Sequence, residues 1–287
     1  MSNNELDDET GVETTGHEWD GIKELNNPLP RWWLWSFYLT IIWGIGYVIA
    51  YPAWPLINGA TEGVLGYSTR GEVAAEIARY DEQNSALTTA LASADLATLP
   101  ENAELNRFAI AAGAAVFRGE CSQCHGSGAA GAKGYPNLLD DDWLWGGSAE
   151  EIAFTINNGI RNETSDDARY SIMPAFGDVL ESKEIEQVVQ YVRALSGQEN
   201  DAVLAALGEP IYGESCAACH GDTGLGDRDL GAPNLSDAIW LYGGDIENLT
   251  QTVTDARFGV MPAMGQRLSA ADVNAVAAYV HQLGGGE

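Results

Sequence analysis

Two copies of the pattern Cys-x-x-Cys-His contain all four cysteines of this 287-residue chain. The first covers residues 121–125 (CSQCH) and the second covers residues 216–220 (CAACH). The pattern is typical of covalent haem c attachment, in which each thiol adds to a porphyrin vinyl group and the histidine binds the iron. The chain is therefore predicted to carry two haem c groups. The predicted attachment cysteines are Cys121, Cys124, Cys216 and Cys219, and the predicted iron ligands beside them are His125 and His220.

A Cys-x-x-Cys pair taken alone could also belong to a zinc site or to a thioredoxin-like redox pair. A zinc site needs further thiol or imidazole ligands, and two of the four histidines lie far from both motifs in sequence. A thioredoxin-like pair is expected near a βαβ pattern, and the chain shows none. The repetition of the complete motif therefore favours haem c over both alternatives.

A haem c iron needs a second axial ligand opposite the histidine, and methionine in that position raises the reduction potential. Met173 (in IMPAFG) and Met261 (in VMPAMG) occupy matching positions after the two motifs, each before Pro-Ala. We expect Met173 to bind the first haem iron and Met261 the second. Met264 aligns with Phe176, so it is expected to pack in the haem crevice and is the reserve ligand for the second haem.

Two more residue types recur at matching distances after the motifs. Pro136 and Pro233 each precede Asn-Leu, and we expect their backbone carbonyl groups to orient the ligating imidazoles. Trp143 and Trp240 stand seven residues beyond these prolines. Each tryptophan could donate an indole hydrogen bond to a haem propionate, or simply pack against the haem.

Helices are predicted before each motif and at the end of each repeat. Apolar periodicity predicts amphipathic helices over residues 104–119 and 201–213, and Pro210 should bend or break the second. Serine-capped helices are predicted over residues 182–197 and 269–285. Each repeat would then hold its haem between an opening and a closing helix.

An uncharged stretch, residues 32–57, predicts one transmembrane helix. Its part up to Ala50 would span about 28 Å as a helix, close to a bilayer core of roughly 30 Å, and aromatic residues stand at both ends. Lys23 and Arg31 precede the span, so the positive-inside rule places residues 1–31 in the cytoplasm. The haem domains would then lie in the periplasm.

The predicted fold class is all-α, with one N-terminal transmembrane helix followed by two tandem cytochrome c-type haem domains. These domains are expected at residues 104–197 and 198–287, with a polar surface loop at 162–171. Residues 58–103 are expected to form periplasmic linker helices without chemistry of their own. Residues 1–18 are polar and acidic without periodicity, which predicts disorder.

Acidic residues dominate the composition, with 42 Asp and Glu against 14 Lys and Arg and a formal net charge of −28. Nucleic-acid binding needs a basic face, so it is not expected. The charge favours docking of a basic protein partner, because complementary potentials speed encounter. An acidic proteome adapted to salt would produce the same composition, and the sequence leaves both explanations open.

The segment HEWDGIKELNNPLPRWWLW at residues 17–35, the single span after it and the tandem motifs resemble one known family. This family is the dihaem subunit III (CcoP/FixP) of cbb3-type cytochrome c oxidases, and the resemblance covers nearly the whole chain. It implies an inner-membrane subunit of a proton-translocating, oxygen-reducing complex. The subunit itself would only relay electrons, from a soluble periplasmic cytochrome c through the monohaem subunit to the haem–copper subunit.

Other functions are compatible with two haem motifs. A cytochrome subunit of another periplasmic dehydrogenase or respiratory complex would share the same domains. A membrane-anchored dihaem peroxidase or a gas sensor would need an open position on one iron, and the matched methionines argue against both.

Overall fold

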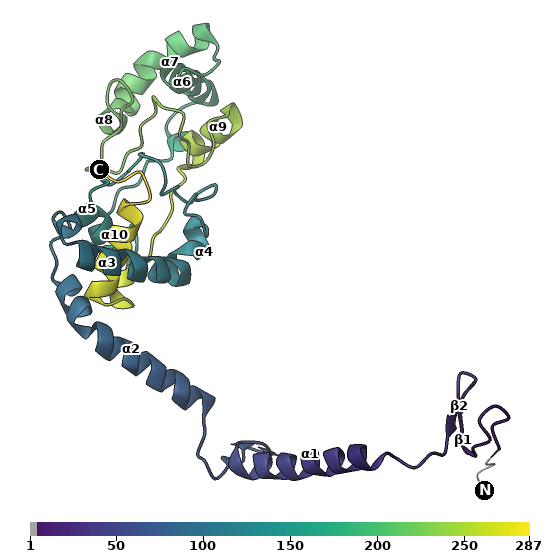
Figure 1. The fold of residues 1–287 in the computed structure, drawn as a ribbon. Coiled ribbons are helices and arrows are strands. Elements are labelled where there is room, and N and C mark those ends of the chain that lie inside the picture. Colours follow the sequence, from purple (N-terminus) through teal and green to yellow (C-terminus); the bar gives the residue numbers. More distant parts are fainter. Residues whose placement is uncertain (1–4) are drawn as a thin grey trace. The chain divides into compact units, whose positions relative to one another are not determined.

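The computed structural model describes residues 5–287, and these are mostly helical. The chain divides into two compact units, Met1–Glu82 and Gln83–Glu287. The second unit contains both Cys-x-x-Cys-His motifs, and Figure 1 shows its helices in two groups.

A small hairpin precedes the membrane helix. Strand β1 (Thr14–Trp19) pairs antiparallel with β2 (Ile22–Leu25). Asp20 and Gly21 join them with φ angles of +48° and +83°, as a two-residue Asp-Gly turn requires. Disorder was predicted for residues 1–18. The prediction is wrong for the part of this segment that forms β1, and residues 1–4 lie outside the described residues.

Helix α1 (Arg31–Ala50) is long and apolar enough to cross a membrane, and none of its residues is buried within the protein. The helix ends at Ala50, before Pro52, because proline cannot continue the hydrogen-bond ladder. The helical part is therefore shorter than the predicted 32–57. Strand β3 (Pro55–Leu56) lies in the last part of this stretch and pairs with β4 (Gly59–Ala60) just beyond it.

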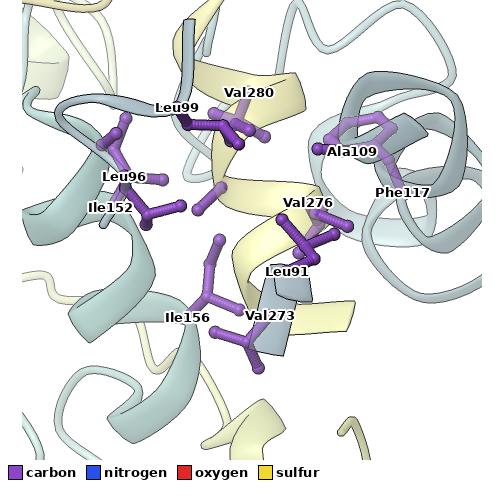
Figure 2. Packing of buried hydrophobic residues seen from close by; sticks show 14 of the residues in the cluster. Leu91, Leu96, Leu99, Ala109, Phe117, Ile152, Ile156, Val273, Val276 and Val280 are labelled. Atoms are coloured by element: carbon purple, nitrogen blue, oxygen red, sulfur yellow. The ribbon is translucent and has the colours of Figure 1, made fainter. Parts of the chain in front are cut away.

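Helix α2 (Thr69–Ala92) is one continuous 24-residue element within the segment where linker helices were expected. The chain then forms the short helix η1 (Leu99–Glu101). Three leucines from this stretch, Leu91, Leu96 and Leu99, are buried in the core of the second unit (Figure 2). The linker thus contributes directly to the hydrophobic core beside the first motif.

The first core joins α3 (Ala103–Val116), α5 (Ala149–Asn158) and the last helix, α10 (Ala270–His281). Figure 2 shows side chains of all three meeting in one cluster. Gly113 allows α3 and α10 to cross closely, since a Cβ at this position would collide with the Ala275 carbonyl group.

The second core joins α6 (Ser182–Leu195), α7 (Ala202–Ser215) and α9 (Ile246–Asp255). Figure 1 shows α6 beside α7, away from α3 and α10. Pro210 lies inside α7, and the helix continues through it, so of the expected bend or break the break does not occur.

The packing of the closing helices differs from the expected domains 104–197 and 198–287. Helix α6 packs on α7 of the following repeat, and α10 returns to α3 of the first repeat. Residues 196–201 form a short link between α6 and α7, and helices joined by short links generally pack as neighbours. The two repeats are consecutive in sequence but exchange their last helices in space.

Candidate haem sites

Helix ends position both motifs. Helix α3 continues through the π-helical turn η2 (Phe117–Cys121) into α4 (Ser122–His125). Helix α7 likewise leads into α8 (Ala217–His220). All four cysteines are unpaired, and in each motif the first is partly buried and the second is exposed. Each pair therefore presents two free thiols and one imidazole on a single helical turn.

Backbone carbonyl groups orient both histidine rings. The Nδ1 atom of His125 lies 3.1 Å from the Pro136 carbonyl oxygen, and that of His220 lies 3.0 Å from the Pro233 carbonyl oxygen. A carbonyl oxygen only accepts, so Nδ1 carries the proton and Nε2 keeps its lone pair for a metal. Burial lowers the pKa of both histidines, more than the carbonyl contact raises it, which also favours the neutral ring that binds iron.

A cavity of about 570 Å³ opens at the second motif. Its wall includes Cys216, Cys219 and His220 together with Met173 and Trp240. Met173 comes from the first repeat, and the short helix η3 (Phe176–Asp178), which begins three residues after it, packs against α9. The residues meeting here are two thiols, an imidazole and a thioether, which are a fitting donor set for haem c.

The first motif lies against the core that α3, α5 and α10 form. Cys121, Trp143 and Met261 all pack against this cluster. Met264 is part of the core itself with only 5 % of its surface exposed, in keeping with its predicted packing role. Its helix η4 (Met264–Gln266) packs on α5.

The structure thus groups the predicted ligands differently from the sequence. Met173 shares a cavity with His220, and Met261 shares a cluster with Cys121. The expected pairing was the reverse, because the repeats were read in chain order. Each methionine precedes a closing helix, and that helix packs on the opening helix of the other repeat. The methionine therefore lies beside the motif of the other repeat.

The indole of Trp143 donates its hydrogen bond to the Gly285 carbonyl oxygen, so it does not supply the donor suggested for a propionate. Trp145, two residues later, has a buried Nε1 without a hydrogen-bond partner among the described residues. The buried Nε of Arg169 is in the same situation, and its guanidinium lies 5.5 Å from the Trp145 ring centroid. Buried donors of this kind call for an acceptor, and a haem propionate supplies one.

Trp145 and Arg169 were missed at the sequence level, although the repeat contains a signal for them. Trp145 in WLWGG aligns with Tyr242 in WLYGG. Arg257 lies over the Tyr242 ring at 4.6 Å, as Arg169 lies over Trp145. An aromatic ring with an arginine above it therefore recurs in both halves.

The residues present fit haem c. The cysteine pairs would hold the porphyrin, the histidines and methionines would bind iron, and Arg169 and Trp145 could meet a propionate. A helical unit of this kind, with a candidate membrane helix before it, defines a membrane-anchored c-type cytochrome.

Comparison with known proteins gives the family. Residues 11–58 match the N-terminal domain of cytochrome oxidase-cbb3, FixP, and residues 108–192 and 203–280 match cytochrome c oxidase, cbb3-type, subunit III. The chain belongs to the subunit III family of cbb3-type cytochrome c oxidases, as the resemblance predicted.

Relatives match over nearly their whole length. The cbb3-type cytochrome c oxidase subunit CcoP of Cereibacter sphaeroides is 60 % identical, over 96 % of this chain and 95 % of the relative. Subunit FixP of Sinorhizobium medicae is 49 % identical, over 98 % of both chains. Subunit CcoP of Rhodobacter capsulatus is 50 % identical, over 96 % of this chain and 97 % of the relative. The predicted fold class, helical with one candidate membrane helix and two cytochrome c domains, is confirmed.

Proposed function

We propose that this chain is the dihaem electron-relay subunit of a cbb3-type cytochrome c oxidase. The observation that carries the proposal is the repeated motif, in which each histidine is oriented by a proline carbonyl group. The names of the relatives support the same conclusion. Two haem c groups are proposed, one on each motif.

Haem c, when bound, supplies an iron that changes reversibly between two oxidation states by one electron. The protein residues hold and tune it. The four cysteines named above fix the porphyrins through thioether bonds, and His125 and His220 present Nε2 to the irons. Met173 and Met261 would also bind the irons, which would leave neither iron with an open position for oxygen or peroxide. Electron transfer without substrate chemistry is the consequence.

The proposed partners follow from the family. Electrons would enter from a soluble periplasmic cytochrome c and leave through the monohaem subunit towards the haem–copper subunit that reduces oxygen. Lys23 and Arg31 before α1 support a cytoplasmic N-terminus, since the next cation is Arg70. The chain would then cross the inner membrane once, with both haems in the periplasm.

Purification from the native membrane in mild detergent, followed by haem staining, tests this proposal. We expect two covalent haems per chain and co-purification with a subunit that contains copper and non-covalent haem. Purification with a dehydrogenase instead would support the alternative respiratory complex. Carbon monoxide binding to the reduced, intact chain would indicate an open iron position and would favour a peroxidase or a gas sensor.

A further inference from the structure

We propose that Val73, Ile77 and Tyr80 on helix α2 form a docking stripe that binds a helix of a neighbouring membrane-anchored subunit. The proposal rests on the proposed function, because an oxidase complex supplies the neighbouring subunit. It adds where on this chain that subunit binds. None of the three residues lines a haem site, and four features support the docking stripe: its exposure, its spacing, its place beside the membrane helix and the charges around it.

The docking stripe is an exposed apolar line along one helix. Val73, Ile77 and Tyr80 are 59 %, 57 % and 60 % exposed. Residues at i, i+4 and i+7 lie on one face of an α-helix, so these side chains follow one another over about 10 Å. Within α2, which the structure describes from end to end, these three are the exposed large hydrophobic side chains. The exposed apolar surface of α2 is therefore gathered on one face.

The spacing of the docking stripe is that of a seam between helices. Steps of four and three residues alternate along it, and the same alternation continues through position 84 to Leu87 and Leu91. Leu87 and Leu91 pack in the helical core of the second unit, where the Asn274 side chain of α10 donates to the Leu91 carbonyl oxygen at 2.9 Å. Apolar residues with this alternation insert into the holes of a facing helix. The C-terminal part of this face binds helices, and the docking stripe presents the same pattern in the N-terminal part.

The first turn of α2 is held beside the end of α1. The Val64 N–H group donates to the Ile49 carbonyl oxygen at 2.9 Å. The Tyr67 ring contacts the Tyr51 ring edge-on, with centroids 5.4 Å apart, and its hydroxyl group donates to the Glu72 carboxylate at 3.0 Å. The docking stripe begins at the next residue, so it starts beside the end of the candidate membrane helix. Subunits anchored in the same membrane have a high effective concentration for each other, so a short stripe is enough for binding.

The charges beside the docking stripe argue against two other occupants. Glu76 and Asp81 flank the stripe at the positions that face the partner in a parallel pair of helices. Two copies of this chain anchored by α1 would run parallel and would bring these like charges together. Helices that lie on lipid carry Lys and Arg beside their apolar face, which does not match this pair of acids. The exposed salt bridge from Arg79 to Glu76 is weak in water, so Glu76 can still meet a basic group. The occupant that fits is a helix with an apolar seam flanked by Lys and Arg.

Photo-crosslinking in intact native membranes tests the docking stripe. The photoreactive residue p-benzoylphenylalanine replaces Ile77 in the full chain. In a matched control it replaces Ala75, which is exposed and lies on the opposite face of α2. We expect illumination to join position 77 to a helix of another oxidase subunit, identified by mass spectrometry of the joined peptides. Position 75 should give no such product.

Other results at position 77 would overturn the proposal. A product with lipid would place α2 on the membrane surface, and a product with a second copy of this chain would make the stripe a homodimer seam. No product, or equal amounts from positions 77 and 75, would show that no helix covers the stripe. These results leave the haems and the copper-containing subunit in place, so they contradict the docking stripe without contradicting the proposed function. A parent chain that purifies without any other subunit would contradict both.

Serine substitutions provide a second measurement, since serine has a helix propensity close to those of valine and isoleucine. We expect V73S/I77S to give about tenfold less intact complex after purification in mild detergent, because burial of one such aliphatic side chain contributes at least this factor. A75S/A78S, with both changes outside the stripe, is the matched control and should give the parent yield. Haem staining per chain should stay at the parent level in both variants. A yield of complex from V73S/I77S equal to that of the control would overturn the docking stripe.

Discussion

At the scale of single residues, the two buried nitrogen donors Arg169 Nε and Trp145 Nε1 lack an acceptor among the described residues, and a haem propionate would supply one. The Arg169 guanidinium also lies 5.0 Å from the Phe154 ring, so two aromatic rings, those of Trp145 and Phe154, surround this cation. Burial lowers the pKa of Arg169, and Glu151 counteracts this effect. A hydrogen-bond acceptor beside Arg169 would offset the cost of burying its charge, and a haem propionate is such an acceptor.

Arg169→Gln should therefore lower the reduction potential of one haem, because removing a positive charge stabilises the ferric state. We expect about 60 mV, which corresponds to a tenfold change for one electron. A spectroscopic redox titration measures it. Arg107→Gln, at an exposed site on α3, is the control and should leave both potentials unchanged. An unchanged potential in R169Q would show that this arginine meets no propionate.

Asp142 gives a pH-dependent effect on the second site, because it lines the same cavity as His220 and Met173. Burial, reinforced by Asp237 and Asp140, raises its pKa to about 6. The carboxyl group is neutral below this pH and negative above it, and a negative charge stabilises ferric haem. One potential should therefore fall as the pH rises through about 6.

Asp142→Asn tests that effect, since asparagine has a similar shape but does not titrate. Redox titrations on both sides of pH 6 should show a pH-dependent potential in the parent chain and a smaller dependence in D142N. An equal dependence in both chains would assign the effect to another group. Asp229→Asn, in the loop that follows the second motif, is a matched control at an exposed carboxylate.

At the scale of the elements, each haem site depends on a helix from the far end of the other repeat. Helix α10 has seven buried residues, and most of them join the cluster beside the first motif. Its contact with α3 joins residues far apart in sequence, and closing such a long loop costs conformational entropy. Dense packing between the two helices must offset this loss. The glycine at the crossing makes that packing possible.

Gly113→Ala should therefore lower the free energy of unfolding by about 1–3 kcal/mol, since overpacking forces the two backbones apart. Gly119→Ala is the control, because a Cβ there meets no other atom. Denaturant unfolding of the haem-loaded protein measures both. Equal stability of G113A and the parent chain would contradict a close contact between α3 and α10.

At the scale of the whole molecule, the strong negative charge bears on how the donor protein docks. We expect the rate of electron transfer from a basic cytochrome c to fall steeply as the ionic strength rises, because salt screens the attraction. Stopped-flow mixing with the reduced donor over a salt series measures this. A neutral donor is the control, and a flat salt dependence with the basic donor would favour salt adaptation as the source of the charge.

The sequence by itself determined the features that depend on local patterns. The motifs predict the attachment cysteines because thioether chemistry needs that spacing along the chain. The membrane helix follows from a charge-free stretch, and the proline carbonyl groups follow from their repeated position. The hairpin at Asp20-Gly21 also depends on a local sequence pattern. Its Asp-Gly turn signal is present in the sequence, but the sequence analysis did not use it.

Only the tertiary structure decided which closing helix and which methionine lie beside which motif. The repeats carry the same pattern, so either closing helix satisfies the apolar face of α3 or of α7. The geometry of the chain selects the helix pairs. The short link 196–201 holds α6 beside α7, so α3 packs against α10. The pair of Trp145 and Arg169 likewise depends on a contact between distant segments, which spacing along the chain does not encode.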